Sequence, residues 1–303
     1  MNNKFISWLI FVLLCVIWGS SFKLMKDGTL ALSPGQIAAL RIFSAGLVFV
    51  PFAFFHFPKI PRKQTGTVIL SAVVGNLLPA FLFAMALTRI DGSLGGILNS
   101  LTPICVAVIG IIFFRERIRF RKITGVLTGF AGLVLLILSP VLAGEKNIQF
   151  GNMGYMMMVF AATLLYGVNV NMVAHYLRNL NAVHVATVSL AFMTIPSALV
   201  LWQLGFFQLD FSQEPVRRSV RATLALGIVC SAIATALFYI LVKRAGGLFA
   251  SLVTYGIPFI AIFLGWLDGE KITLPEIGCL LIILFGVYLA NRPEKKRTAP
   301  AGA

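Results

Sequence analysis

The chain has 303 residues, of which 59% are hydrophobic and only 12% are charged, whereas soluble domains carry about 25% charged residues. This composition, with a mean hydropathy of +0.93, excludes an ordinary soluble domain. The net charge of +15 does not indicate nucleic-acid binding, because the basic residues form short clusters between apolar runs. In a membrane protein, an excess of lysine and arginine usually records topology instead.

Apolar runs long enough to cross a bilayer, which takes about 20 residues per helix, fill most of the chain. We interpret the first run as a transmembrane helix and not as a signal peptide, because no small-x-small cleavage site precedes a soluble region. The sequence therefore predicts an all-α integral membrane protein with ten transmembrane helices. The runs lie at about 5–25, 34–57, 66–87, 93–114, 123–142, 153–173, 183–206, 220–242, 247–267 and 275–291.

Lysine and arginine are distributed unevenly between alternate connections of these helices. The two ends of the chain and every second connection hold 16 of them, the other connections hold 8, and Arg41 lies inside the second span. Because the excess marks the cytoplasmic side, both termini are expected in the cytoplasm, with "RERIRFRK" (115–122) as a cytoplasmic anchor. The basic tail 293–303, rich in proline and alanine, is expected to be disordered.

The two halves of the chain carry similar motifs in the same order. "TRIDGSLGGILNSLTP" (88–103) aligns with "KRAGGLFASLVTYGIP" (243–258) at an offset of 155, and "LCVIWGSS" (14–21) aligns with "ATLLYGVN" (162–169) at 148. We interpret this as a duplication of five helices, residues 1–145 and 146–292. Because five is odd, the second copy enters the membrane upside down, and inverted repeats of this kind are typical of transporters.

Several of these motifs resemble one family in particular. "VIWGSSF", "LTP" followed by "FFRERI", "YGIP" followed by "LDGEKI", and the C-terminal "GVYLANR" resemble the EamA branch of the drug/metabolite transporter superfamily. The resemblance extends from about Ser7 to Arg292. It implies ten helices in two inverted halves and the export of amino acids or other small metabolites.

Motifs for chemistry are missing from the sequence. There is no G-x-x-x-x-G-K-[ST] phosphate loop and no recognisable Ser-His-Asp or Cys-His set, so we expect no enzymatic activity, no cofactor and no metal. No carboxylate falls in the middle of a span, which disfavours proton-driven export of cationic drugs. The four cysteines lie in apolar runs without metal-ligand spacing and are expected to be small core residues.

Arg41 is the one charge within a predicted span, and two interpretations of it remain open. It faces a cavity and holds a substrate carboxylate through a bidentate pair, or it snorkels towards the near membrane surface or bonds to a carbonyl group. Seven residues separate it from Pro34, a depth of about 10 Å at 1.5 Å per residue.

Other polar or aromatic residues fall within the spans and are the candidates for a midplane cavity between the halves. The alternative for each is a hydrogen bond between helices. Together with Arg41, the candidate substrate-binding residues are Trp18, Ser21, Asn76, Asn99, Tyr166, Asn169, Tyr239 and Tyr255. Pro103 and Pro258 are expected to form either hinges or static kinks in matched helices.

The sequence thus favours a secondary transporter that exports amino acids or similar small metabolites by alternating access. Export of hydrophobic drugs or phosphorylated metabolites is the alternative, and a membrane enzyme or sensor is disfavoured by the lack of clustered titratable groups. The expected partners are the lipid bilayer of the inner (plasma) membrane and a small-molecule substrate, without nucleic acid. We expect a monomer; the alternative is a homodimer through Gly125, Gly129 and Gly132.

Overall fold

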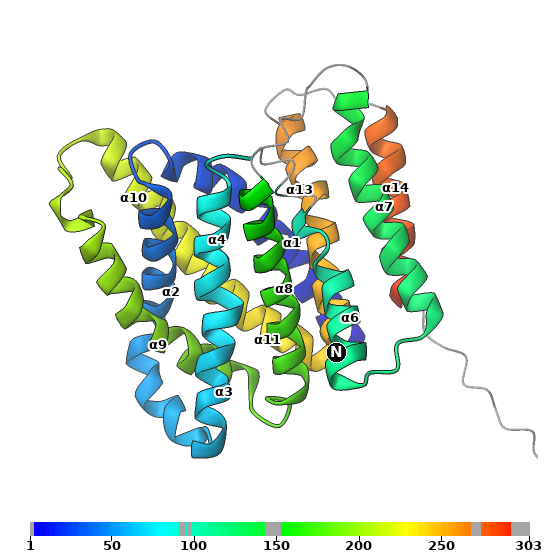
Figure 1. Cartoon of the computed structure of the whole chain (residues 1–303), viewed down its shortest axis with the longest axis horizontal. Coiled ribbons are helices and arrows are strands. Elements are labelled where there is room, and N and C mark those ends of the chain that lie inside the picture. Colours follow the sequence, from blue (N-terminus) through cyan, green and yellow to red (C-terminus); the bar gives the residue numbers. More distant parts are fainter. Residues whose placement is uncertain (1–2, 91–94, 96–97, 143–152, 268–273, 292–303) are drawn as a thin grey trace, which may run out of the picture.

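The computed structural model describes residues 3–90, 95, 98–142, 153–267 and 274–291 (Figure 1). Within these ranges every regular element is a helix. The prediction of an all-helical protein is therefore confirmed for the described part of the chain. The expected boundary between residues 145 and 146 and the tail 293–303 lie outside the described residues.

The helices follow one another with short connections. The first part of the chain forms α1 (Asn3–Gly28), α2 (Pro34–His56), η1 (Phe57–Lys59), α3 (Arg62–Ala72), η2 (Val73–Leu77), α4 (Leu78–Ala86), α6 (Thr102–Phe114) and α7 (Phe120–Leu142). The rest forms α8 (Met153–His175), α9 (Ala182–Gln203), η3 (Phe206–Gln208), α10 (Glu214–Gly227), η4 (Ile228–Ile233), α11 (Ala234–Ala245), α12 (Gly247–Ser251), α13 (Val253–Leu267) and α14 (Leu274–Asn291).

Among the described residues, six helical segments are long and apolar enough to cross a membrane. They are Lys4–Ser21, Pro34–Lys59, Arg62–Ala86, Met153–His175, Ala182–Gln203 and Glu214–Ala245, and shorter apolar helices lie at Thr102–Phe114, Gly247–Ile260 and Leu274–Ala290. The predicted runs at 34–57, 153–173 and 183–206 agree with these segments to within a few residues. The protein is therefore an integral membrane protein whose helices cross the bilayer several times.

Local sequence explains where several helices begin and end. At the start of α2, the Ser33 hydroxyl accepts from the Gln36 amide, the Gln36 side chain accepts from the Ser33 amide, and Pro34 follows the cap; this is a capping box. At the end of α6, Arg115 takes a left-handed conformation with φ of 52°. Between α11 and α12, Gly246 has φ of 91°, which favours glycine because it has no Cβ.

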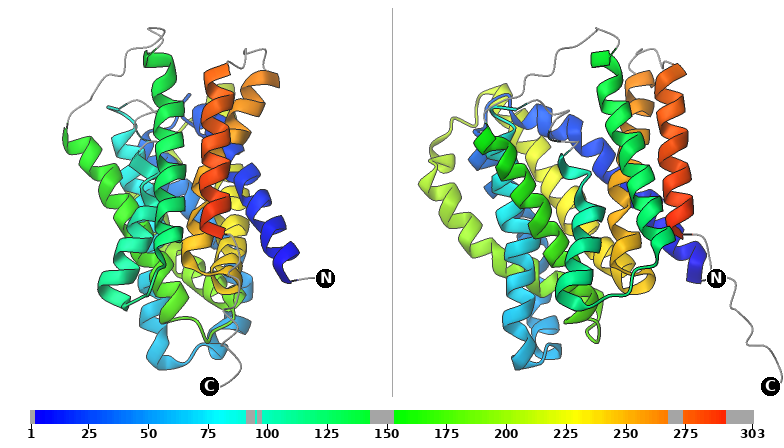
Figure 2. Two further views of the ribbon diagram at one scale, coloured as in Figure 1. Left: turned by 90° about the vertical axis from the view of Figure 1, so that its right-hand side faces the viewer. Right: turned by 45° about the vertical axis from the view of Figure 1, so that its right-hand side comes forward.

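Both described ends of the chain lie in the lower half of the molecule in Figure 1. The same views show α1 running upwards and α8 running downwards, and Figure 2 agrees after rotation. The loops that follow α2, α6 and α8 also lie at the lower end, and they carry Lys59, Arg115 and Arg178. The basic connections therefore gather on one side of the bundle, as the charge distribution predicts.

Helices from the two parts of the chain interlock. α1 packs against α10, η4, α11 and α13, whereas α8 packs against α3, η2, α4 and α6. α2 packs along α9, and α7 packs along α14, side by side in Figures 1 and 2. Each helix therefore buries much of its surface on partners far away in the sequence.

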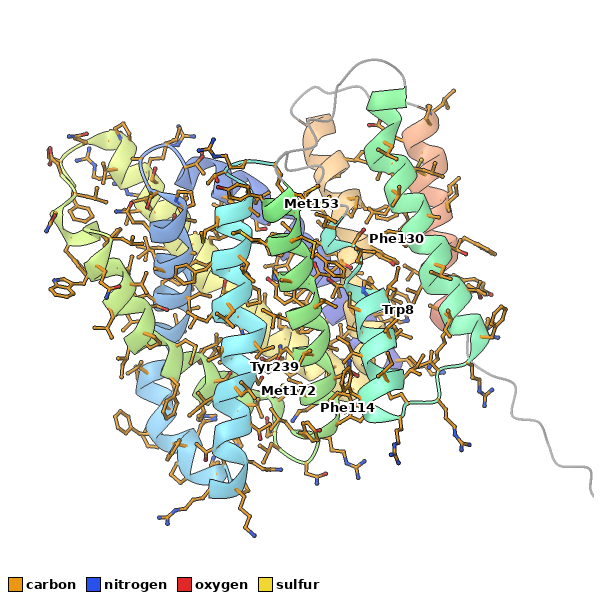
Figure 3. The ribbon with its side chains drawn as sticks, in the orientation of Figure 1. Trp8, Phe114, Phe130, Met153, Met172 and Tyr239 are labelled. Carbon is orange, nitrogen blue, oxygen red and sulfur yellow. The ribbon has the colours of Figure 1, made fainter. Side chains whose placement is uncertain are left out.

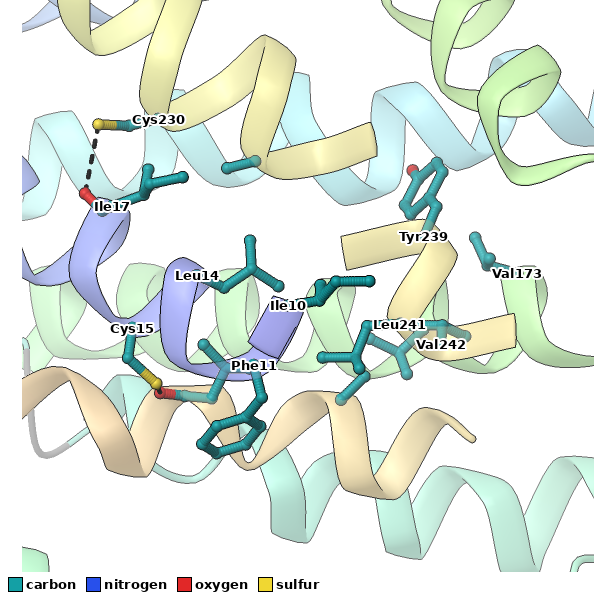
Figure 4. Packing of buried hydrophobic residues seen from close by; sticks show 14 of the residues in the cluster. Ile10, Phe11, Leu14, Cys15, Ile17, Val173, Cys230, Tyr239, Leu241 and Val242 are labelled. Atoms are coloured by element: carbon teal, nitrogen blue, oxygen red, sulfur yellow. Dashed lines mark hydrogen bonds between the residues drawn. The ribbon is translucent and has the colours of Figure 1, made fainter. Parts of the chain in front are cut away.

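The interior around α1 is apolar and closely packed (Figure 4). Leu14 is fully buried, and it lies in the same cluster as Leu241 and Val242 of α11. The Cys230 thiol donates to the Ile17 carbonyl over 3.4 Å and joins η4 to α1. All four cysteines are buried and free, which confirms their expected role as core residues.

Two irregular segments occur at corresponding places in the chain. The π-helical segments η2 and η4 interrupt otherwise continuous helices, and their first residues, Val73 and Ile228, are 155 positions apart. A second pair of breaks lies at Leu101 and Leu252, whose amides bond three residues back over 3.2 Å. These breaks align "GGILNSL" (95–101) with "GGLFASL" (246–252) at an offset of 151.

The second alignment changes the expected correspondence of the two prolines. Pro103 lies in the first turn of α6, directly after the break at Leu101. Pro258 lies inside α13, six residues after the break at Leu252. The two prolines therefore do not occupy equivalent positions relative to the breaks.

The glycines of α7 are covered by α14 of the same chain. A Cβ at Gly125 would lie 2.4 Å from the Ala290 amide nitrogen, and a Cβ at Gly286 would lie 2.3 Å from the Gly129 amide nitrogen. Close approach of backbones at small residues is a typical way to pack helices in lipid. This face is therefore occupied within the chain, which leaves it unavailable for a homodimer.

This packing makes a prediction about stability. Gly286→Ala places a methyl group against the α7 backbone, and overpacking of this kind costs about 1–3 kcal/mol, so the melting temperature in detergent falls. Gly278→Ala is the matched control on the same helix, because nothing lies within 4 Å of its Cβ position. An equal melting temperature for both variants would contradict the close α7–α14 contact.

Candidate functional site

A cavity of about 310 Å³ lies where α1 ends and α2 begins, and these helix ends are at the top of the bundle in Figure 1. Its wall is formed by the end of α1, the start of α2, α4 and the last turn of α10, which contribute Met25, Pro34, Phe83 and Leu226. Most of this lining is apolar. Arg41 is the only charged residue among its lining residues in the described part of the chain.

Arg41 is held in place by a serine from the later part of the chain. Its Nε donates to Ser231 Oγ over 2.6 Å, and the Ser231 hydroxyl in turn lies 3.4 Å from the Leu226 carbonyl oxygen. Among the described residues, neither terminal nitrogen of the guanidinium has a hydrogen-bond or ion-pair partner. The fork that recognises carboxylates or phosphates is therefore free beside the cavity.

Tyr166 belongs to the same region. Its ring lies 6.1 Å from that of Phe83, a residue of the cavity wall. Cys230 directly precedes Ser231, the serine that holds Arg41. α2, α8 and η4 thus bring an arginine, a tyrosine and a cysteine to one region below the cavity.

Below Arg41, one face of η4 and α11 carries a polar residue at every fourth position. We call Ser231, Thr235, Tyr239 and Lys243 the polar stripe, because a spacing of four residues places side chains on one face of a helix. The Thr235 hydroxyl donates to Asn76 Oδ1 of η2 over 3.2 Å. The Asn76 amide nitrogen is buried and has no hydrogen-bond partner.

Tyr239 lies at the centre of a buried polar cluster. Its hydroxyl is 3.1 Å from Ser71 Oγ of α3 and accepts from Asn169 Nδ2 of α8 over 3.4 Å. The Ser71 hydroxyl donates to Asn169 Oδ1 over 2.8 Å. The exposed fractions of Ser71, Asn169 and Tyr239 are 0%, 4% and 1%, so this cluster is enclosed by protein.

The lower end of the bundle is closed by further contacts between distant helices. Lys243 donates to the carbonyl oxygens of Leu177, over 2.6 Å, and Leu180. His175 Nε2 lies 3.1 Å from Glu116 Oε1, and the Nδ1 atoms of His56 and His184 are 2.7 Å apart. These contacts join helices that are far apart in the sequence at the lower end of the bundle.

Polar contacts at the upper end tie α1 to α10 beside the mouth of the cavity. Asp27 Oδ1 pairs with Arg218 Nη2 over 2.8 Å, and the Ser219 hydroxyl donates to the Asp27 carbonyl oxygen over 3.0 Å. In the preceding loop, hydrogen bonds from the Ser212 hydroxyl and amide and from Gln213 lower the pKa of Asp210. These charges lie at the ends of helices, where water is accessible.

Trp18 and Ser21 use their polar groups within the protein. The Trp18 indole nitrogen donates to the Cys230 carbonyl oxygen over 2.9 Å, and the ring packs against Phe238. This bond joins α1 to the π-helical segment η4. The Ser21 hydroxyl donates to the Trp18 carbonyl oxygen of its own helix.

Asn99 and Tyr255 lie outside the groups described above. Asn99 is half-buried beside the break at Leu101, and its carbonyl oxygen accepts from the Thr102 hydroxyl. The Tyr255 hydroxyl donates to the Val126 carbonyl oxygen of α7 over 3.1 Å. Tyr255 also borders a separate apolar cavity of about 630 Å³ between α1, α13 and α14.

The structure therefore connects Trp18, Arg41, Asn76, Tyr166, Asn169 and Tyr239 around the cavity and the polar stripe. Sequence reasoning did not select Ser71, Ser231, Thr235 or Lys243 as site residues. The four-residue spacing from Ser231 to Lys243 was the available signal, and it becomes visible only when the helix is read as one continuous face.

The hydrogen bond of Trp18 predicts that this tryptophan contributes more to stability than an exposed tryptophan does. Trp18→Phe leaves the Cys230 carbonyl without its donor, at a cost of about 1–3 kcal/mol, and lowers the melting temperature by several degrees. Trp202→Phe is the control, because Trp202 is 70% exposed. If both variants melt like the unmodified protein, a stabilising hydrogen bond from Trp18 to η4 is contradicted.

Comparison with known proteins identifies one family and several relatives. The model of the EamA-like transporter family matches residues 6–138 and 153–292. The chain is 26% identical to the WAT1-related protein At3g02690, chloroplastic, of Arabidopsis thaliana over 97% of this chain and 71% of that protein. It is 24% identical to the S-adenosylmethionine/S-adenosylhomocysteine transporter of Chlamydia muridarum, over 83% of this chain and 80% of the relative.

One further relative and one solved structure agree with these matches. The uncharacterized transporter YoaV of Bacillus subtilis is 23% identical over 90% of this chain and 92% of its own length. One solved crystal structure superposes with a TM-score of 0.73 over 94% of this chain and 96% of the other, at 20% identity, and so has the same fold. Because the family model matches almost the whole chain, this protein belongs to the EamA-like transporter family.

Proposed function

We propose that this protein is a secondary transporter that exports amino acids or similar small metabolites by alternating access. One observation carries the proposal: among the described residues, the cavity near the upper end has the terminal nitrogens of Arg41 beside it, while hydrogen bonds of Tyr239 and Lys243 join distant helices towards the lower end. A pathway that is open at one end and closed at the other corresponds to one of the two states that alternating access requires.

Two inverted five-helix halves, residues 1–145 and 146–292, provide the second state in this proposal. The opposite directions of α1 and α8, the matched π-helical segments η2 and η4, and the matched breaks at Leu101 and Leu252 support it. The paired contacts support it as well, because α1 packs on α13 as α8 packs on α6. Exchange of the two conformations between the halves then opens the lower end.

In this proposal the substrate carries a carboxylate, which Arg41 binds through its two terminal nitrogens. Trp18 and Tyr166 provide aromatic surface near the cavity, and the hydroxyl and amide groups of Ser21, Asn76, Asn99, Asn169 and Tyr239 are the remaining candidates for contact with the solute. Tyr255 is not assigned such a contact, because its hydroxyl bonds to Val126. Amino acids fit this arrangement because each has one carboxylate. The relative from Chlamydia muridarum transports S-adenosylmethionine and S-adenosylhomocysteine, which are amino acids with a large substituent.

Two alternative cargoes make different demands on the site. A phosphorylated metabolite needs more cationic groups, and Lys243 is the only other described cation along the polar stripe. A hydrophobic drug needs no charge at all and would leave the two terminal nitrogens of Arg41 without a partner. Neither alternative uses the single free guanidinium as well as a carboxylate does.

We further propose a multi-pass protein of the inner (plasma) membrane with both termini in the cytoplasm. The lower end in Figure 1 is then cytoplasmic, which agrees with the basic residues Lys59, Arg115 and Arg178 on its loops. In this proposal the protein acts as a monomer, because α14 covers the glycine face of α7. It uses no cofactor and has no enzymatic activity.

Flux through purified protein in proteoliposomes tests the proposal. Exchange of radiolabelled amino acids is expected above the rate of empty vesicles, and Arg41→Gln is expected to raise the Michaelis constant about 10- to 100-fold, since it removes a charged hydrogen-bonding group. Arg221→Gln is the matched control, because Arg221 is exposed. A broad panel of amino acids and metabolites without any flux would count against transport, and unchanged flux in Arg41→Gln would exclude the proposed carboxylate contact.

A further inference from the structure

The polar stripe runs from the cavity towards the lower end of the bundle, and each of its four residues makes a separate hydrogen bond to another part of the chain. Ser231 binds Arg41, Thr235 binds Asn76, Tyr239 binds Ser71 and Asn169, and Lys243 binds carbonyl groups at the end of α8. Figure 3 shows Tyr239 in the lower half of the molecule, near the level of Met172. It lies six residues before the end of α11, about 9 Å along the helix.

Tyr239, Ser71 and Asn169 come from three different helices and meet directly in line with the stripe. α3 contributes the serine, α8 the asparagine and α11 the tyrosine. Polar side chains at this depth require partners, because an unpaired polar group in a dry interior is costly. Three hydrogen bonds among three enclosed side chains therefore hold the three helices together at one point.

The neighbouring amide of Asn76 is not satisfied in the same way. Its Oδ1 accepts from Thr235, whereas its Nδ2 is buried without a partner. A buried donor of this kind destabilises the arrangement that encloses it. The closed state thus contains a well-bonded cluster at Tyr239. Beside this cluster, on η2, the Asn76 amide nitrogen gains a hydrogen bond if its surroundings rearrange or take up water.

We propose that Ser71, Asn169 and Tyr239 form the inner gate of the transport pathway, and that Tyr239 is its central residue. The gate closes the pathway below the Arg41 cavity through the hydrogen bonds of the Tyr239 hydroxyl. When these bonds separate, the solute moves past Asn76 and Thr235 towards Lys243 along the polar stripe. This inference rests on the proposed transport function, and it gives Tyr239 a gating role in addition to its candidate contact with the solute.

A hydroxyl that stabilises only the closed state shifts the equilibrium when it is removed. Tyr239→Phe keeps the ring and its packing against α11 and α8, but it removes the partner of Ser71 and Asn169. The Tyr239 hydroxyl makes two hydrogen bonds, one of them long at 3.4 Å. The open population on the lower side is therefore expected to rise about two- to tenfold, the range for the net loss of one good hydrogen bond. Tyr255→Phe is the matched control, because that hydroxyl is also fully buried and bonds only to Val126, away from the stripe.

Cysteine labelling measures the gate without any substrate. The four native cysteines are replaced by alanine, and Ala84→Cys is introduced on the wall of the cavity. A membrane-impermeant thiol reagent is then added to inside-out vesicles, so that it reaches Ala84→Cys only through the lower end. The labelling rate is expected to rise two- to tenfold in Tyr239→Phe and to stay unchanged in Tyr255→Phe, with Ser71→Ala as a second variant that removes the same contact.

The possible results separate the gate from the proposed function. Faster labelling from the lower side in Tyr239→Phe and Ser71→Ala supports the gate even if no solute in the flux panel is transported. Equal rates in Tyr239→Phe, Ser71→Ala and Tyr255→Phe overturn it, even if flux is present. Melting temperatures of all variants are measured in parallel. If labelling is faster in Tyr255→Phe as well, and the melting temperatures of all variants fall together, the faster labelling reports loss of folding and the proposed gate is overturned.

Discussion

The absence of water from the hydrocarbon core is the constraint on which the rest of this structure depends. Backbone groups in that region must bond within helices, so each departure from a regular helix needs a partner from elsewhere. At η4 the partner is the Trp18 indole, which donates to the Cys230 carbonyl oxygen. The irregular segment that carries Ser231 is thus stabilised by a helix from the other part of the chain.

The same constraint explains why polar side chains gather in one place. Hydroxyl and amide groups cannot face lipid without cost, so they meet inside the bundle along η4 and α11. Arg41 illustrates the principle most clearly, since a charge within a span is tolerated only beside a cavity or a partner. It has both, with Ser231 on one side and the open cavity on the other.

Sequence reasoning predicted those features that depend on composition and periodicity. Apolar runs located the helices, and the excess of lysine and arginine placed the basic loops on one side of the bundle. Trp18, Arg41 and Tyr239 were recognised as candidates because polar or aromatic residues are conspicuous in such runs. Their partners were not predictable, because the Cys230 carbonyl that accepts from Trp18 lies 212 residues away in the sequence.

Other parts of the site were hidden for equally physical reasons. Ser71 and Thr235 look like ordinary helical hydroxyl residues, which commonly bond to their own backbone, and only the packing of α3 and α11 gives them a shared role. Tyr255 has the same chemistry as Tyr239 but bonds to α7. The offset of 151 at the helix breaks also escaped the alignment on the prolines, which treated Pro103 and Pro258 as equivalent.

The orientation of the two halves is the central claim, and labelling of two loops in intact cells tests it most directly. Arg117→Cys lies in the loop after α6, and Lys271→Cys lies between α13 and α14 in the sequence. With a membrane-impermeant thiol reagent, inverted halves predict that position 271 reacts from outside the cell and position 117 reacts only after the membrane is opened. Reaction of both positions from the same side would contradict the inverted arrangement and the alternating-access mechanism built on it.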